Sequence, residues 1–219
     1  METSSPERLI DHTLLRPDAR ESEIRQLCTE AITHRLMAVC VNPFWIELVA
    51  ELLKGSHSLP ITVTGFPLGA STSKNKAIES AEAILLGAHE IDTVMNIGLA
   101  KEGRWQEVEK DLREVVKASG IIPVKVIIET CYLNPEEIVA ASQASVAAGA
   151  AFVKTSTGFG PRGATVEDIR LMRKTVGPLI GVKASGGIRD AELFKRMRDA
   201  GASRIGSSSS VKILGDLKK

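Results

Sequence analysis

The chain has 219 residues, of which 43% are hydrophobic and 25% are charged, and its 28 basic and 27 acidic residues leave a formal net charge of +1. Enough apolar surface is present to form a core, which excludes an intrinsically disordered chain. The balanced charge, without long basic runs, argues against binding to nucleic acids or to membrane surfaces, and we expect small-molecule ligands instead.

Hydropathy and cysteine content indicate the compartment. No apolar run approaches the roughly 18 residues that span a bilayer, and the first residues, METSSPERLI, contain no hydrophobic segment of the signal-peptide type. We therefore expect a cytoplasmic protein. Cys28, Cys40 and Cys131 are odd in number and show no CxxC spacing, so we expect reduced thiols rather than disulfides or a zinc cluster.

Short β-branched segments alternate with helical segments along the chain. The predicted strands are, in order, 8–15, 37–41, 61–66, 90–96, 124–130, 151–156, 179–185 and 203–208. Segments between them, such as 24–32 and 105–116, carry one apolar stripe at helical spacing. Asn134 before Pro135 and Thr165 before Asp168 are typical helix N-caps.

The spacing of these segments indicates the fold. Strand centres lie about 28 residues apart, the length of a strand, a crossover helix and short loops. Three helix ends share a phrase in which glycine leads into a strand, at 87–91, 149–153 and 201–205. We predict an α/β fold, a (β/α)8 TIM barrel forming a single domain over 1–219, with an open doubly wound sheet as the alternative.

Lysines occur inside strands that such a barrel buries on both faces, where a charge is costly unless it is paired. Lys154 and Lys183 lie in the sixth and seventh predicted strands, and Asp92 lies in the fourth. Two ammonium groups in a poorly hydrated pocket lower each other's pKa, which would allow one amine to attack a carbonyl while Asp92 transfers protons. Alternatively, each lysine pairs with a carboxylate or extends to water. The pattern does not say which lysine would be the nucleophile.

Glycine and serine residues follow the last two predicted strands. Gly186 and Gly187 come after the seventh, and a run from Gly206 to Ser210 comes at the end of the eighth. Exposed backbone amides, serine hydroxyls and a helix N-terminus at these positions would form an anion cradle, at the usual phosphate site of barrel enzymes. A serine run alone is more often only a loop or a helix start.

Eight ordered segments resemble the 2-deoxyribose-5-phosphate aldolases, the class I (Schiff-base) aldolases of deoxynucleoside breakdown. They are IDHTLL (10–15), AVCVNP (38–43), VTGFPLGAST (63–72), EIDTVMNIG (90–98), VKVIIETCYL (124–133), FVKTSTGFG (152–160), GVKASGGIR (181–189) and ASRIGSSS (202–209). The resemblance implies that Lys154 forms the imine, that Lys183 lowers its pKa and passes protons, and that Asp92 is the acid/base partner.

The same resemblance implies further site residues. It assigns the sugar phosphate to Gly158, Gly186, Gly187, Gly206 and Ser208. We add Arg189 as an electrostatic helper. Asp11 and Thr13 resemble residues that hydrogen-bond substrate hydroxyls, with a cap or core hydrogen bond as the alternative. Cys40 lies in a buried strand, where a cysteine normally acts as a small hydrophobic residue, and it would lie near the carbonyl. Lys125 and Glu129 share a strand face, and we interpret them as a buried ion pair that supports Lys154.

The implied reaction is reversible cleavage of 2-deoxy-D-ribose 5-phosphate into acetaldehyde and D-glyceraldehyde 3-phosphate, by a homodimer or homotetramer without a cofactor. We expect no metal, because His12, His34, His57 and His89 show no HxH or HExxH spacing. Two alternatives remain open. One is a sugar-phosphate isomerase or epimerase that uses a carboxylate base, and the other is an inactive barrel that senses sugar phosphates.

Overall fold

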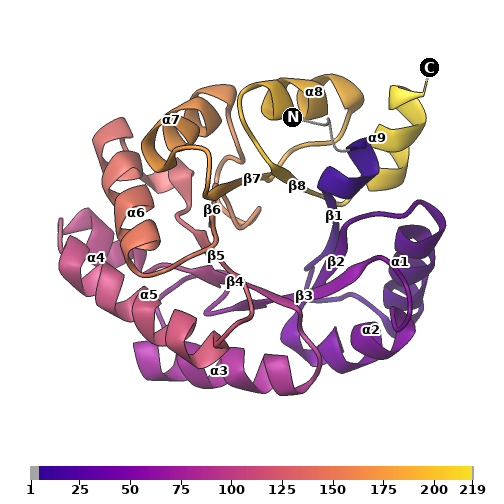
Figure 1. Cartoon of the computed structure of the whole chain (residues 1–219), viewed down its shortest axis with the longest axis horizontal. Helices are drawn as coiled ribbons and strands as arrows, with labels where there is room; N and C mark the ends of the chain where they lie inside the picture. The colour runs from indigo at the N-terminus through magenta and orange to yellow at the C-terminus, as the bar shows by residue number, and fades with distance from the viewer. Residues whose placement is uncertain (1–4, 219) are drawn as a thin grey trace.

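Eight parallel strands form a closed barrel surrounded by helices in the computed structural model, which describes residues 5–218 (Figure 1). Each strand pairs with the next one in the chain, and β8 pairs with β1 to close the barrel. The predicted (β/α)8 barrel is confirmed, and the open doubly wound sheet is wrong. No helix in the described part of the chain is long and apolar enough to cross a membrane.

Each predicted strand is observed. The bounds are β1 (Ile10–Leu14), β2 (Ala38–Val41), β3 (Leu59–Thr64), β4 (Glu90–Val94), β5 (Val124–Ile127), β6 (Phe152–Lys154), β7 (Gly181–Ser185) and β8 (Arg204–Ser207). Most of them end earlier than predicted, because the residues that follow turn away into loops. Those loops lie at the carboxyl ends of the strands, where barrel enzymes carry their active sites.

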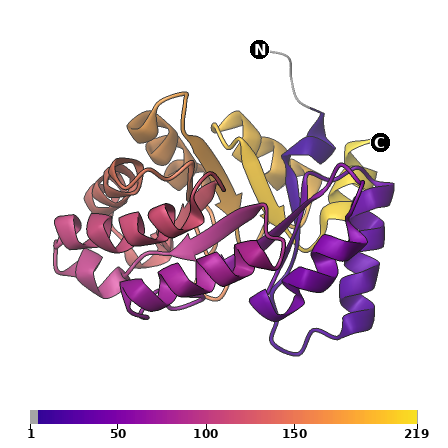
Figure 2. The same ribbon diagram turned by 60° about the horizontal axis from the view of Figure 1, so that its bottom comes forward.

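The helices pack around the outside of the strands (Figures 1 and 2). They are α1 (Glu21–Thr33), α2 (Ile46–Leu52), α3 (Ser73–Leu85), α4 (Ile97–Lys101), α5 (Trp105–Ser119), α6 (Pro135–Ala147), α7 (Val166–Val176), α8 (Ala191–Asp199) and α9 (Ser210–Leu217). Among residues 5–218, a short 3-10 helix (Pro6–Leu9) precedes β1, and two more, Pro43–Trp45 and Thr130–Tyr132, lie in the connections after β2 and β5.

Local signals in the sequence set the helix ends. The Asn134 side chain accepts a hydrogen bond from the Glu137 amide at 2.8 Å, and Thr165 accepts one from the Asp168 amide at 3.0 Å. Both predicted N-caps are therefore confirmed. Glycines with positive φ follow α3, α6 and α8, at Gly87, Gly149 and Gly201, as expected where a chain leaves a helix toward a strand.

Apolar residues form two separate regions. The larger lies between the strands and the helices, and includes Ile24, Leu112 and Phe194. The smaller lies around β2 and β3 and comprises Leu15, Ala38, Cys40, Ile61 and Val63. The other strands contribute buried charged side chains that pair with one another. This division leaves one part of the barrel interior polar.

A glycine at the start of β7 makes room for an aromatic ring. A Cβ atom on Gly181 would lie 2.0 Å from Cδ1 of Phe152. We expect Gly181→Ala to displace this ring and to lower the free energy of unfolding by about 1–3 kcal/mol, the usual cost of overpacking. The measurement is urea denaturation. Gly215→Ala is the matched control, because its added methyl group meets nothing within 4 Å, and equal stability of the two variants would contradict the prediction.

Candidate active site

Three of the predicted site residues meet at one oxygen atom. Lys154 on β6 and Lys183 on β7 are direct register partners, and both are buried. The Nζ atoms of Lys154 and Lys183 lie 2.7 and 2.8 Å from Oδ2 of Asp92, which comes from β4. One carboxylate oxygen therefore bridges the two amines, and a proton has a short path between them.

The two lysines differ in their surroundings. Burial lowers the pKa of Lys154, and the charge of Lys183 lowers it further against the opposing effect of Asp92. Burial alone would also lower the pKa of Lys183, but Asp11 and Asp92 outweigh it and raise that pKa. Asp11 Oδ2 lies 2.5 Å from the Lys183 amine. Near neutral pH, Lys154 is therefore the amine that loses its proton more easily.

The carboxylates of the interior are held in their ionised form. Burial would raise the pKa of Asp92, but Lys125, Lys154 and Lys183 outweigh it and hold this pKa well below its usual value. Burial likewise opposes ionisation of Asp11, yet Arg204 and Lys183 lower its pKa to about 2. Asp92 can therefore accept hydrogen bonds from the amines of both Lys154 and Lys183.

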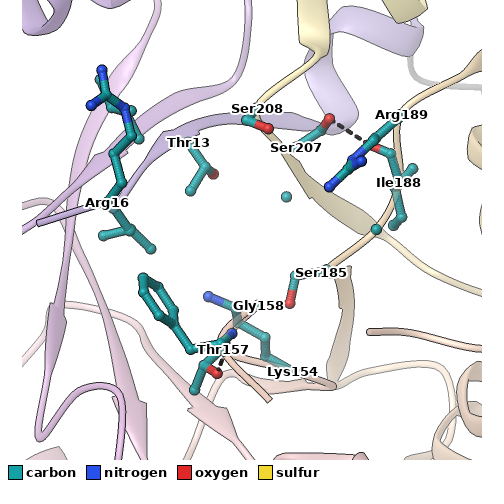
Figure 3. Close-up of a pocket in the computed structure, with 16 residues that line it drawn as sticks. Thr13, Arg16, Lys154, Thr157, Gly158, Ser185, Ile188, Arg189, Ser207 and Ser208 are labelled. Atoms are coloured by element: carbon teal, nitrogen blue, oxygen red, sulfur yellow. Dashed lines mark hydrogen bonds between the residues drawn. The ribbon is translucent and has the colours of Figure 1, made fainter. Parts of the chain in front are cut away.

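A cavity of about 270 Å³ opens above these groups (Figure 3). Its lining includes Thr13, Leu14, Leu15, Arg16, Lys154, Thr157, Gly158, Phe159, Ser185, Gly186, Gly187, Ile188, Arg189, Gly206, Ser207 and Ser208. Lys154 reaches into this space, and Arg189 and Ser208 lie across it (Figure 3). Asp92 and Lys183 lie behind Lys154 and do not line the cavity.

One wall of the cavity consists largely of the backbone of the loops that follow β6, β7 and β8. Gly158, Gly186 and Gly187 have φ values of +90°, +83° and +79°, which other residues rarely adopt. Gly163 packs so closely that a Cβ atom there would lie 2.1 Å from the Gly186 carbonyl oxygen. Ser208 lies in the turn just before α9. Such a wall suits an anion, because backbone amides and a nearby guanidinium can all face it.

The family model described as DeoC/LacD family aldolase matches residues 8–212. The chain belongs to this family. It is 57% identical over 211 residues to the deoxyribose-phosphate aldolase of Brevibacillus brevis, covering 96% of each chain. It is 54% identical over 215 residues to that of Caldanaerobacter subterraneus, covering 97% of this chain and 93% of the relative. A solved deoxyribose phosphate aldolase from Aeropyrum pernix, described as tetrameric, superposes with a TM-score of 0.91 at 32% identity, covering 99% and 94%.

This DeoC/LacD aldolase places the remaining predicted site residues at different depths. Thr13 and Ser208 line the cavity, whereas Asp11 lies below it against Lys183 and Arg204. Cys40 is fully buried on β2, and burial together with Asp92 raises its thiol pKa to about 11. Its thiol therefore stays protonated at neutral pH.

The expected ion pair between Lys125 and Glu129 is wrong. Lys125 contacts Asp92 at 2.8 Å and Glu90 at 2.7 Å. Strand β5 ends at Ile127, and Glu129 has a φ of +50°, so the alternation that put both side chains on one face stops before Glu129. Glu129 instead accepts hydrogen bonds from the backbone amide and hydroxyl of Thr157 and anchors the loop after β6.

Two buried charged residues of the barrel interior were not predicted from the sequence. Glu90 and Arg204 contact each other at 2.7 Å, and both are buried. Strand periodicity could have found Glu90, because it precedes Asp92 by two residues and so shares its face. Within residues 5–218, no three His, Cys, Asp or Glu side chains are arranged to hold a metal ion.

Proposed function

We propose that this aldolase cleaves 2-deoxy-D-ribose 5-phosphate reversibly into acetaldehyde and D-glyceraldehyde 3-phosphate, through an imine at Lys154. The observation that carries the proposal is that an amine with a lowered pKa reaches into a cavity whose opposite wall suits an anion. Relatives with more than half of their residues identical bear the name deoxyribose-phosphate aldolase. The site fits 2-deoxy-D-ribose 5-phosphate, because the open-chain form of this sugar carries an aldehyde at one end and a phosphate at the other.

Lys154 is the better nucleophile of the two lysines. Its amine lines the cavity, whereas Lys183 lies behind it. An amine must be unprotonated to attack a carbonyl, and burial favours that form for Lys154 while Asp11 and Asp92 keep Lys183 charged. We assign Lys183 to the supply of positive charge and protons, and Asp92 to proton transfer between the two amines.

The reaction then proceeds through imine formation, cleavage of the C2–C3 bond and hydrolysis of the imine. The Lys154 amine attacks C1 of the open-chain aldehyde, and the resulting carbinolamine loses water to give a protonated imine. A relay of Asp92, Lys183 and water removes the proton of the C3 hydroxyl, the C2–C3 electron pair moves toward the iminium nitrogen, and D-glyceraldehyde 3-phosphate leaves. Protonation of the remaining enamine at C2 and hydrolysis of the imine release acetaldehyde and restore the amine.

We propose that opposite sides of the cavity bind the two ends of the substrate. We assign the phosphate to the amides around Gly158, Gly186, Gly187, Gly206 and Ser208, with Arg189 adding positive charge. We assign Thr13 to a substrate hydroxyl. Asp11 precedes it by two residues on β1, and Cys40 is its register partner on β2. Binding energy at the phosphate would position the aldehyde at Lys154, which raises the rate beyond simple affinity.

Borohydride reduction in the presence of substrate tests the proposal. Acetaldehyde release, together with a stable secondary amine that peptide mass spectrometry locates at Lys154, is the expected result. A sugar-phosphate isomerase or epimerase would turn over substrate without becoming trapped, and an inactive sensor would bind it without turnover. Either outcome would contradict the proposed reaction.

The phosphate assignment predicts a selective effect of charge at Ser208. We expect Ser208→Glu to raise KM for deoxyribose 5-phosphate by about 100-fold, because a carboxylate would repel the phosphate dianion inside the cradle. KM for unphosphorylated 2-deoxyribose should change less than threefold. Ser208→Ala is the matched control and should change either value only slightly. Equal effects of the glutamate on both sugars would place the phosphate elsewhere.

We extend the proposal to assembly, domain limits and compartment. A homodimer or homotetramer is supported by the relative from Aeropyrum pernix that is described as tetrameric, and light scattering after gel filtration tests it, with a monomer as the contradicting result. One catalytic domain over 1–219 is supported by the family match over 8–212, although 1–4 and 219 lie outside the described residues. Free Cys28, Cys40 and Cys131 support a cytoplasmic location.

A further inference from the structure

Six buried side chains form a closed ring of alternating charge inside the barrel. Following the contacts around the ring, Asp92 pairs with Lys125, Lys125 with Glu90, Glu90 with Arg204, Arg204 with Asp11, Asp11 with Lys183, and Lys183 with Asp92. The nitrogen–oxygen distances around the ring lie between 2.5 and 2.8 Å. Each carboxylate oxygen of the ring therefore has a cationic partner.

The ring is electrically neutral by itself. It contains the carboxylates of Asp11, Glu90 and Asp92 and an equal number of cations, and each cation contacts two carboxylates. Lys154 lies outside the ring and, among the described residues, contacts a carboxylate only at Asp92 Oδ2, which it shares with Lys183. A protonated Lys154 is thus a surplus positive charge in a buried site.

We propose that Glu90 and Arg204 are positioning residues of the reaction, which close the ring on the side away from the substrate cavity and so leave no spare negative charge to hold a proton on Lys154. This inference rests on the proposed function. Neither residue lines the cavity, so both act through Asp11, Asp92 and Lys125. Without Arg204, the ring would carry net negative charge, and Lys154 would keep its proton.

The aromatic side chain of Phe152 lies beside two cations of the charged ring, Lys125 and Arg204. Lys125 Nζ lies 5.8 Å and the Arg204 guanidinium carbon 5.6 Å from its centroid, distances at which cations are attracted to an aromatic face. Glu90 and Arg204 are only 5% and 4% exposed. Water therefore screens the charges of this region less than it would at the surface, and we expect a change of one charge here to affect Lys154.

The strands around Lys154 differ in the ionisable groups that they carry. The ionisable groups that surround it are Asp11 from β1, Cys40 from β2, Glu90 and Asp92 from β4, Lys125 from β5, Lys183 from β7 and Arg204 from β8. His12 also lies on β1, but its ring pairs with Glu30 of the outer helix α1 at 2.8 Å. Strand β3 contributes the apolar residues Ile61 and Val63. Cys40 stays neutral at the pH values of interest because burial raises its thiol pKa to about 11. The ring therefore sets the charge that Lys154 experiences.

The test is the pH dependence of kcat/KM for acetaldehyde release, whose acid limb reports ionisation in the free enzyme. Arg204→Met removes a positive charge, which stabilises protonated Lys154, so we expect the acid limb to move up by roughly one pH unit. Glu90→Gln removes a negative charge and should move it down by a similar amount. The double variant is neutral again, and its acid limb should return to within about 0.3 units of wild type.

A merely structural role would lower the rate in both single variants without moving their acid limbs in opposite directions, and that result overturns the proposal. Asp111→Asn is the matched control. It also removes a buried carboxylate, from the pair with Lys76 between α3 and α5, and should lower stability while leaving the acid limb in place.

Folding and the proposed function are tested separately. Circular dichroism shows which variants fold. If a single variant does not fold, Arg204→Lys and the double variant test the proposal instead, because both keep the ring neutral. A displaced acid limb in either of them contradicts the proposal. Wild-type enzyme that releases no acetaldehyde would refute the proposed function. Wild-type activity with unmoved acid limbs in the variants would refute only the role of the ring.

Discussion

Lys154→Met is expected to lower acetaldehyde release from deoxyribose 5-phosphate by at least about 10⁴-fold, the size of loss seen when a catalytic nucleophile is removed. Methionine retains the length and apolar stem of the side chain but has no amine. No imine can then form in the cavity, and Lys183 cannot replace Lys154, because it lies behind it and its pKa is raised by Asp11 and Asp92. Borohydride trapping should disappear together with the activity.

Two further variants sharpen this experiment. Lys101→Met removes an exposed amine that pairs with Glu137 on the outside of the barrel, and its activity should equal that of wild type. Lys183→Met should still be trapped at Lys154, but only at higher pH, because the positive charge that lowers the Lys154 pKa is gone. Activity of Lys154→Met within tenfold of wild type, or a label on Lys183, would contradict the assignment of the nucleophile.

Asp92→Asn is the second variant for which we expect a large effect, because one carboxylate serves three buried cations. Lys125, Lys154 and Lys183 all contact it within 2.8 Å. Removing one partner from a buried ion pair usually costs about 3–5 kcal/mol, and we expect at least that loss in the free energy of unfolding. Proton transfer between the amines would also stop, so activity should fall by about 10³-fold or more.

The pH dependence of stability provides an independent readout for Asp92. Its pKa in the folded protein is well below the usual value, so the carboxylate stabilises the fold above its unfolded pKa of about 3.9, and this stabilisation is lost as the pH falls toward the folded pKa. Urea denaturation of wild type should therefore show decreasing stability below about pH 5. The asparagine variant should show a shallower dependence in the same range.

Asp111→Asn separates stability from catalysis in this comparison. It leaves the buried Lys76 without its carboxylate, and this pair has no contact with the site lysines. The variant should lose stability but retain activity. If Asp92→Asn behaved in the same way, with lowered stability and a normal rate, Asp92 would be a structural residue and the proposed proton relay would be wrong.

Local patterns determined the framework of this protein. Strand and helix periodicity, together with caps at Asn134 and Thr165 and glycines such as Gly149, act between residues close in the chain. These local signals were therefore sufficient to predict the eightfold repeat and the barrel from the sequence. The motif FVKTSTGFG and its companions indicated the family for the same reason, since each motif is a continuous segment.

Periodicity failed where the chain leaves regular structure. Glu129 was placed on the face of Lys125 by alternation, but its positive φ turns the chain after β5, and its side chain contacts Thr157 instead. Ile32 was expected in the apolar stripe of its helix, yet it is 44% exposed near the end of α1. Both residues lie at the end of an element or just beyond it, where the repeating geometry no longer applies.

Apart from the family resemblance, only the tertiary structure distinguished the two lysines. The sequence placed both in strands, but their pKa values depend on the cavity above Lys154 and on Asp11 beside Lys183. Arg204 and Asp11 are 193 positions apart in the chain and meet only because β8 pairs with β1. Electrostatic interactions depend on distances in space and on exclusion of water, and closure of the barrel creates both.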